Sequence, residues 1–259
     1  MIVCADADLE RAAQGALLGS CMNTGHYCCG TERIYVLDSI YDSFVGKVVA
    51  AAKQLRQSDT GETDVGAVFW DQQLGIIESH MADAVAKGAR VLVGGRRNPR
   101  LKGLYYEPTV VVDVNHEMEL MRKETFGPIV AIQRVASEEE ALRLANDSEY
   151  GLNGNVWTTD AEKGQRLAER METGGVCVND MALTYGVPEA PFGGVKSSGV
   201  GQVNGAQGIR GYCHAHPILA DRKGTGKIQG GYPYTRKAED GMQKFIRLLW
   251  GTRLGRWLA

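Results

Sequence analysis

The feature that most constrains this chain is the alternation of short β-branched runs with longer helical segments. Strands separated by helices of ten or more residues need crossover connections, which are right-handed and place helices over the sheet. The predicted fold class is therefore α/β, a mainly parallel sheet with helices on both faces. The predicted strands are 33–37, 90–93, 109–113, 129–135, 153–158 and 175–179, and the predicted helices are 6–20, 38–52, 71–87, 138–145 and 161–172.

Charge and composition exclude several classes of partner and location. Lys and Arg total 29 against 31 Asp and Glu, so the net charge of -2 provides no general attraction for nucleic acid. No uncharged apolar run approaches the roughly 18 residues of a membrane span, and the first residues are acidic where a signal peptide would be basic. The six cysteines include no C-x-x-C pair, which favours a reducing compartment. We therefore expect a cytoplasmic protein without a nucleic-acid partner.

The last part of the chain differs in composition from the rest. Residues 221–259 hold nine basic and three acidic residues, which predicts an α/β domain over 1–220 and a basic C-terminal tail over 221–259. Apolar residues at helical spacing and basic residues between them are typical of a helix in peripheral membrane contact. The alternative is that the apolar face docks onto the domain, since two glycines weaken the helix. The residues are Met242, Phe245, Ile246, Leu249, Trp250 and Trp257, with Lys244, Arg247, Arg253 and Arg256 basic and Gly251 and Gly255 as the glycines.

The densest candidate for chemistry is the stretch GHYCCG, between a helix end and a strand. A thiol in such a turn is partly exposed and surrounded by backbone N–H groups, which favour the thiolate and stabilise a developing oxyanion. Cys28 is therefore a nucleophile candidate. The alternative is that Cys28 and Cys29 are small side chains buried in the interior, because free cysteine is among the most buried residue types. His26 is predicted to be a solvated turn residue, because residues two apart seldom form a Cys-His pair.

A second candidate is the loop sequence RKETFGP, which places Glu124 and Phe126 at a sharp turn. Such residues are compatible with a solvated carboxylate and a core aromatic, or with a site that binds the hydroxyls of a sugar. In parallel sheets, functional loops gather beyond the carboxyl ends of the strands, where we expect the site. Cys213, His214 and His216 lie on one short stretch and do not close a tetrahedral site, so no metal site is predicted.

Together these segments resemble the aldehyde dehydrogenase superfamily. Six motifs occur in the order of the family: IVCADADLERA, NTGHYCCGTERIYV, ETFGP, YGLNGNVWTTD, GGVCVND and PFGGVKSSGVG. The cysteine of the nucleophile motif falls on Cys28, and His26 replaces the usual Gln. The resemblance covers about residues 1–220 and implies the fold of the catalytic domain of the family.

The resemblance also implies an activity and the residues that perform it. Members oxidise an aldehyde to a carboxylic acid through a cysteine thiohemiacetal and thioester, with hydride transfer to NAD or NADP. By this resemblance Cys28 is the nucleophile and its backbone N–H contributes to the oxyanion hole. Glu124 would hold the nicotinamide ribose, and Phe126 would flank the nicotinamide.

The resemblance further suggests which partners the chain needs. Family members carry a dinucleotide-binding domain before the matching region, with a Glu-Leu-Gly-Gly general base, and no such motif occurs in this sequence. We therefore expect a small-molecule aldehyde as substrate and a chain that supplies the missing cofactor domain, or a homo-oligomer. The alternatives are a non-catalytic interaction subunit and a thiol esterase that works without NAD.

Overall fold

The computed structural model describes residues 1–222, 224, 226 and 232–252. The chain divides into two units, Met1–His214 and Ala215–Ala259, which are described separately here. The sequence-based division at residue 220 stays a prediction.

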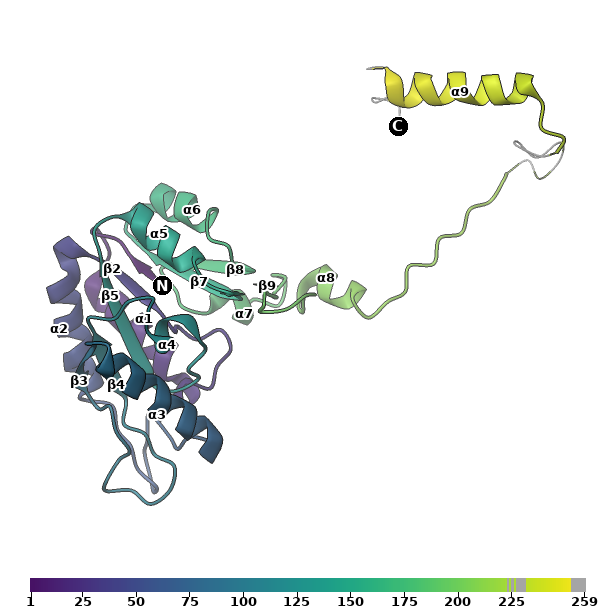
Figure 1. Cartoon of the computed structure of the whole chain (residues 1–259). Helices are drawn as coiled ribbons and strands as arrows, with labels where there is room; N and C mark the ends of the chain where they lie inside the picture. The colour runs from purple at the N-terminus through teal and green to yellow at the C-terminus, as the bar shows by residue number, and fades with distance from the viewer. Residues whose placement is uncertain (223, 225, 227–231, 253–259) are drawn as a thin grey trace. The chain divides into compact units, whose positions relative to one another are not determined.

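The first unit is built on a seven-stranded sheet, whose strands lie in the order β3-β4-β5-β2-β1-β7-β8 (Figure 1). Neighbouring strands run parallel, except for the antiparallel pair of β3 and β4 at one edge. The α/β fold class and the mainly parallel sheet are therefore confirmed. The strands are β1 Ile2–Val3, β2 Ile34–Leu37, β3 Arg90–Val93, β4 Thr109–Val112, β5 Ile129–Val135, β7 Asn153–Trp157 and β8 Gly175–Val178.

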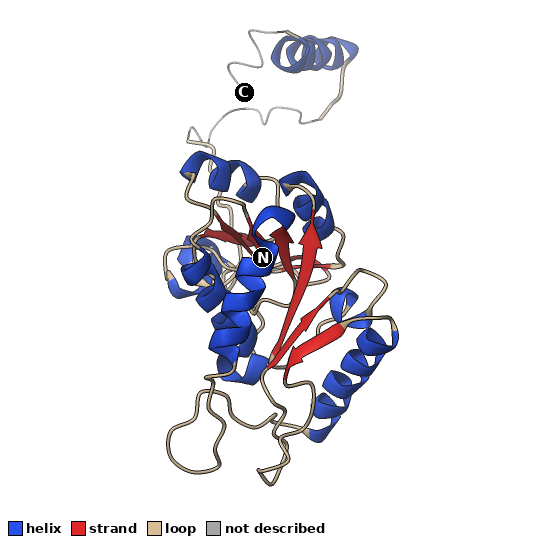
Figure 2. Cartoon of the chain, turned by 90° about the vertical axis from the view of Figure 1, so that its left-hand side faces the viewer, coloured by secondary structure: helices blue, strands red, loops and turns tan. Residues whose placement is uncertain are grey.

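Helices cover both faces of this sheet, as Figure 2 shows. Successive side chains of a strand point to opposite faces, so Ile34 and Val36 of β2 enter one core with α1 and α2. Tyr35 and Leu37 enter the other core, with apolar residues of α3, α5 and α6. Two separate apolar cores thus hold the layers together. The helices are α1 Leu9–Cys21, α2 Tyr41–Ala52, α3 Asp71–Ala86, α5 Glu138–Asn146 and α6 Ala161–Ala168.

Several short elements connect these layers, and the sequence does not predict them because none has more than six residues. A two-stranded antiparallel sheet pairs β6 with β9. The short elements are η1 Met22–Gly25, η2 Asp38–Ile40, α4 Glu119–Arg122, β6 Tyr150–Gly151, α7 Leu183–Gly186, β9 Val195–Lys196 and α8 Gly205–Arg210.

The central strand β1 is also absent from the sequence prediction. Its two residues, Ile2 and Val3, are fully buried between β2 and β7, but two residues cannot show a period. Asp8, and not the predicted Asp6, caps α1 by accepting hydrogen bonds from the next N–H groups. Asp6 instead accepts a 2.7 Å hydrogen bond from the hydroxyl of Thr158 and pairs with Lys163. These two contacts of Asp6 therefore link the end of β1 to the segment that follows β7.

The second unit contains the helix α9, Arg236–Gly251, which is capped by the hydroxyl of Thr235. None of its described side chains is buried. Of the predicted tail residues, Arg253, Gly255, Arg256 and Trp257 lie outside the described residues. Within the described part of the chain, the helices are too short or too polar to cross a bilayer.

The packing of α1 on β7 yields a prediction for Gly15→Ala. A Cβ at Gly15 would overlap the buried ring of Trp157, which a hydrogen bond to Asn155 holds in place. Overpacking of this kind costs about 1–3 kcal/mol, so the midpoint of urea unfolding should fall. Gly46→Ala on the exposed face of α2 is the control, because open space surrounds that position. It should leave the midpoint unchanged or raise it, and equal losses in both variants would contradict the clash.

Candidate active site

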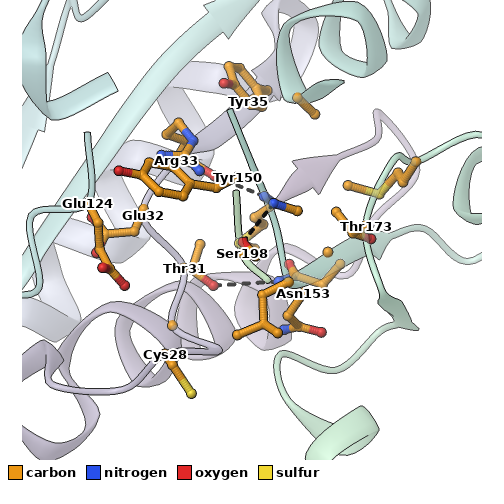
Figure 3. A pocket seen from close by; sticks show the side chains of 18 of the residues that line it. Cys28, Thr31, Glu32, Arg33, Tyr35, Glu124, Tyr150, Asn153, Thr173 and Ser198 are labelled. Atoms are coloured by element: carbon orange, nitrogen blue, oxygen red, sulfur yellow. Dashed lines mark hydrogen bonds between the residues drawn. The ribbon is translucent and has the colours of Figure 1, made fainter. Parts of the chain in front are cut away.

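A cavity of about 310 Å³ collects residues from several segments of the first unit that lie far apart in the sequence (Figure 3). Cys28 precedes β2, Glu124 precedes β5, and Asn153 begins β7. These residues lie at the amino ends of the strands, so the expectation that the site lies beyond the carboxyl ends is wrong. The reason is that the segments leading into these neighbouring parallel strands meet at the same edge of the sheet. The cavity brings Cys28 and Glu124 together, although 95 residues separate them in the sequence.

The loop that carries Cys28 follows the end of α1. Asn23 and Thr24 adopt left-handed backbone angles, with φ of 50° and 62°, and the side-chain amide of Asn23 donates to the carbonyl of His26. The N–H of Gly30 then donates to the carbonyl of Tyr27 at 2.8 Å and closes a turn around the two cysteines. The side chain of Cys28 is exposed in this turn. It is therefore accessible to a small electrophile.

The other thiols differ from Cys28 in exposure. Cys29 is buried, with its sulfur 3.7 Å from that of Cys28. Burial raises the pKa of Cys29, Cys4 and Cys21 to about 12, which keeps these thiols protonated and unreactive near neutral pH. Cys213 is exposed and lies near the end of the first unit. The alternative that both cysteines are small buried side chains is therefore correct for Cys29 and wrong for Cys28.

The carboxylate of Glu32 holds the turn that carries Glu124 and Phe126. It accepts hydrogen bonds from the backbone N–H groups of Thr125, at 3.2 Å, and Phe126, at 3.0 Å. These bonds maintain Phe126 at a φ of 50°, a conformation that bulky residues rarely adopt. Gly25 lies directly against the backbone of Gly127, where a Cβ would overlap the carbonyl. The Cys28 loop and the Phe126 turn therefore form one connected unit.

Arg33 supplies the positive charge of the cavity. Partial desolvation in the concave site raises the pKa of Glu124, and the charge of Arg33 opposes that rise. The same two effects act on Glu32, where burial is also the larger cause and raises the pKa. Atom Nη1 of Arg33 is buried and has no hydrogen-bond partner among the described residues. The cavity thus offers one cationic group and two carboxylates.

Phe126 is not among the residues that line the cavity; it packs against the imidazole of His26, with ring centroids 5.7 Å apart. His26 is half-buried and also contacts Phe69 edge to face at 4.9 Å, so the prediction of a solvated histidine is wrong. Desolvation lowers the pKa of His26, which favours the neutral ring at pH 7.

Side-chain hydrogen bonds connect β7 to the loops around the cavity. The amide of Asn153 donates to the carbonyls of Cys29, at 3.2 Å, and Met181, at 2.7 Å. The hydroxyl of Ser198, in the glycine-rich PFGGVKSSGVG segment, accepts from the N–H of Gly151. These contacts fix the position of the cysteine turn relative to the sheet.

Glu32, Arg33 and Asn153 were missed as site residues by the sequence analysis. The available signal was a pair of adjacent opposite charges, Glu32 and Arg33, directly before a buried strand. Charged residues at such a position need partners or an open cavity. The partners of Glu32 are the N–H groups of Thr125 and Phe126, more than ninety residues later in the sequence.

One cluster outside the cavity has potential metal ligands. In the part of the chain that the structure describes, ligand atoms of Cys4, Asp6 and Glu138 lie within 4.8 Å of one another. The ammonium of Lys163 lies 3.1 Å from each of the two carboxylates and supplies a positive charge there. The cluster is therefore explained as an ion-pair network.

Comparison with known proteins identifies the family. The model described as "Aldehyde dehydrogenase family" matches residues 1–218. This chain belongs to the aldehyde dehydrogenase family. Its resemblance to that family, drawn above from six motifs, is thereby confirmed.

Individual relatives agree with this assignment. The 4,4'-diapolycopene aldehyde oxidase of a Methylomonas species is 35% identical over 97% of this chain and 47% of its own length. The structure of betaine aldehyde dehydrogenase from Staphylococcus aureus in complex with NAD+ is 38% identical, with a TM-score of 0.78 over 82% of this chain and 42% of that one. A crystal structure described as an E. coli NADP dependent enzyme is 36% identical, with a TM-score of 0.78 over 82% and 44% of the two chains. The chain thus spans less than half the length of these relatives.

The exposure of the cysteines predicts their order of alkylation. Brief treatment with iodoacetamide at pH 7, followed by peptide mapping, should label Cys28 fastest because its thiol is accessible in a turn with unpaired N–H groups. Cys213, the other exposed cysteine, is the internal reference. The buried Cys4, Cys21, Cys29 and Cys177 should stay unlabelled while the protein is folded. Faster labelling of Cys213 or Cys177 than of Cys28 would contradict the assignment of Cys28 as nucleophile.

Proposed function

We propose that this chain oxidises an aldehyde to a carboxylic acid through a thioester on Cys28, together with NAD or NADP. The observation that carries this proposal is the shared cavity of the accessible Cys28 thiol and the Glu124 carboxylate. Membership of the aldehyde dehydrogenase family supports it, as do relatives that are named as aldehyde-oxidising enzymes.

The chemistry follows from the position of Cys28. The thiolate attacks the carbonyl carbon of the aldehyde, a C–S bond forms, and the carbonyl electron pair moves to oxygen. The N–H of Cys28, which has no acceptor among the described residues, donates to that oxygen. A bound dinucleotide would supply the acceptor for the hydride that leaves the thiohemiacetal carbon. Attack by water on the resulting thioester then breaks the C–S bond and releases the carboxylic acid and the thiol.

Two residues of the ETFGP turn are suited to hold the dinucleotide. Glu124 exposes a carboxylate that can accept hydrogen bonds from both hydroxyls of a ribose. Phe126 presents an aromatic side chain that can flank the nicotinamide, and Glu32 keeps its backbone in the necessary conformation. The exposed carboxylate and the adjacent ring fit this cofactor, and they do not discriminate between NAD and NADP.

The proposal extends to partners and location. The segment near α8 exposes Ile209 at 72% and Tyr212 at 87%, which supports contact with another chain in a homo-oligomer or with a chain that supplies the cofactor domain. The six cysteines are all free, which supports a reducing compartment such as the cytoplasm. The substrate is a small-molecule aldehyde.

A second proposal concerns α9 and an anionic membrane surface. Its apolar residues Met242, Phe245 and Ile246 recur at helical spacing and are each about half exposed, while Lys244 and Arg247 lie on the opposite side of the helix. Such a helix lies in the plane of a membrane interface, where its basic face meets anionic headgroups. The alignment with the 4,4'-diapolycopene aldehyde oxidase covers 97% of this chain and therefore extends into α9.

The proposed reaction predicts that this chain alone oxidises aldehydes poorly. The only carboxylates among the described residues that line the cavity are Glu32, which is bound to backbone N–H groups, and Glu124, which we assign to the ribose. Loss of a positioned base typically lowers the rate by about 10²-fold or more. NADH formation should rise at least that much when the unmatched part of the Staphylococcus aureus enzyme is co-expressed.

The matched variants for this experiment are Cys28→Ser and Cys213→Ser. Cys28→Ser should abolish the restored activity, and Cys213→Ser should retain it. Full activity of Cys28→Ser would overturn the proposed function, and strong NAD+-dependent turnover by the chain alone would show that it supplies its own base.

The proposed membrane contact predicts binding to anionic vesicles. The full chain should co-sediment with phosphatidylserine-containing vesicles, and a chain that ends at Asp240 should not. Phe245→Glu should weaken binding because it removes apolar burial, whereas Ile209→Glu, the same kind of change at an exposed apolar residue of the first unit, should not. Equal binding by all chains, or no binding by any, would eliminate the membrane contact.

A further inference from the structure

The adjacent thiols of Cys28 and Cys29 lie close together in the turn before β2. Their sulfur atoms are 3.7 Å apart, and either thiol can donate a weak hydrogen bond to the other. Cys28 is exposed and Cys29 is only 1% exposed, so one sulfur of the pair is open to a reagent and the other is shielded from solvent. The aldehyde oxidation proposed above uses the exposed thiol and leaves the buried one without a role.

The turn holds the two sulfurs in this arrangement. The N–H of Gly30 donates to the carbonyl of Tyr27 at 2.8 Å and closes the turn. The side-chain amide of Asn153 donates to the carbonyl of Cys29 at 3.2 Å and ties the turn to β7. Because the backbone around both thiols is held before a ligand arrives, little conformational entropy is lost when the two sulfurs bind one atom.

The separation of the sulfurs suits one bridging atom better than a direct disulfide. An atom that binds both sulfurs at about 2.3 Å, a usual metal–thiolate length, with a near-tetrahedral angle places them about 3.8 Å apart. A disulfide is less suitable, since neighbouring Cα atoms lie about 3.8 Å apart and most disulfides join Cα atoms at roughly 4.4–6.8 Å. The observed 3.7 Å between the sulfurs therefore matches a bridged dithiol.

The surroundings of the pair decide which kind of atom it can hold. A structural zinc ion needs four ligands, usually from cysteine and histidine. Among the residues that the structure describes, three potential ligand atoms lie within 4.8 Å of one another only at Cys4, Asp6 and Glu138, so the two thiols have no third ligand at such a distance. Trivalent arsenic with one organic substituent brings its third ligand with it and needs only two thiols. Sulfur is a soft ligand and favours a soft acceptor of this kind.

We propose that Cys28 and Cys29 form a dithiol site that captures trivalent organic arsenicals through bonds from both sulfurs to one arsenic atom. The thiol of Cys28 adds to the As=O group, so that an As–S bond forms and the thiol proton moves to the oxygen. The thiol of Cys29 then displaces that hydroxyl, a second As–S bond forms, and the second proton leaves with it as water. Arsenic stays trivalent and neither sulfur is oxidised, so the capture needs no oxidant or reductant.

The two thiols differ in the order in which they react. Cys28 is exposed and is therefore the thiol that a reagent meets first. Burial, and after it the charge of a Cys28 thiolate, raise the pKa of Cys29 to about 12. Once Cys28 is bonded to arsenic it carries no charge, so the second of these causes disappears. Cys29 then becomes the shielded member of a closed ring, which slows release of the arsenical.

The inference goes beyond the proposed function and does not rest on it, because the capture involves only the two thiols. A chain that captures the arsenical but shows no Cys28-dependent NADH formation after complementation would lose the proposed function and keep this site. A chain that forms NADH through Cys28 but binds the arsenical through one sulfur would keep the proposed function and lose this site.

The test is titration of the full chain with phenylarsine oxide, followed by mass spectrometry of the intact protein. We expect one phenylarsenic group per chain without its oxygen, because water leaves when the second As–S bond forms. 2,3-Dimercaptopropanol should release this group, and an equal concentration of 2-mercaptoethanol thiol should not. An added mass that includes the oxygen, or release by 2-mercaptoethanol, would show attachment through one sulfur and overturn the site.

Matched variants assign the two bonds. Cys28→Ser and Cys29→Ser should each weaken binding of phenylarsine oxide by about a hundredfold or more, because a second bond within one site typically contributes about 10²–10⁴-fold. Cys213→Ser removes the other exposed thiol and should bind as tightly as the unsubstituted chain. Circular dichroism spectra verify that each variant is folded. Undiminished binding by Cys28→Ser or by Cys29→Ser would contradict the two-thiol site.

A measurement on the unsubstituted chain covers the case in which Cys29→Ser does not fold. The folded chain is treated briefly with iodoacetamide before and after it is saturated with phenylarsine oxide. Labelling of Cys28 should be lost in the saturated sample, and labelling of Cys213 should be unchanged. Equal labelling of Cys28 in the two samples would mean that the arsenical binds elsewhere and would overturn the proposal.

Discussion

The carboxylate of Glu32 connects the two halves of the candidate site. It lies three residues after Cys29, at the entry to β2, and accepts two backbone hydrogen bonds from the turn that precedes β5. These two hydrogen bonds maintain a left-handed conformation at Phe126. The close packing of Gly25 on Gly127 adds a second contact between the same two loops. The position of Glu124 relative to Cys28 depends on this connection.

The sheet determines where this connection forms. Its central strands, β2 and β1, are fully buried, and their alternating side chains serve two apolar cores. Residues 31–33 directly precede β2 and lie at its amino end, at the same edge of the sheet as the starts of β5 and β7. A cavity at this edge can hold charged groups such as the exposed Glu124 because water reaches it. The same groups would be strongly destabilising a few residues further along the strand.

Aromatic contacts give the site a second face beyond the cavity. His26 stands where the family resemblance has a Gln, and it packs between Phe69 and Phe126. The substitution therefore replaces an amide with a ring that joins two aromatic side chains. The ring of His26 thus contacts both the segment before α3 and the Phe126 turn.

The sequence by itself determined the α/β class, the main strands and helices, and the candidate residues Cys28, Glu124 and Phe126. Periodic apolar patterns and sequence motifs carry that information, because each pattern and each motif lies within a short stretch of the sequence. The two-residue strand β1, the cap at Asp8 and the roles of Glu32 and Arg33 came only from the tertiary structure. Two residues show no period, and a charged side chain gains its role from partners that the sequence does not place beside it. Only the tertiary structure showed that the site lies at the amino ends of the strands. The edge of the sheet at which a loop lies depends on the fold of the whole sheet, which is not a local property of the sequence.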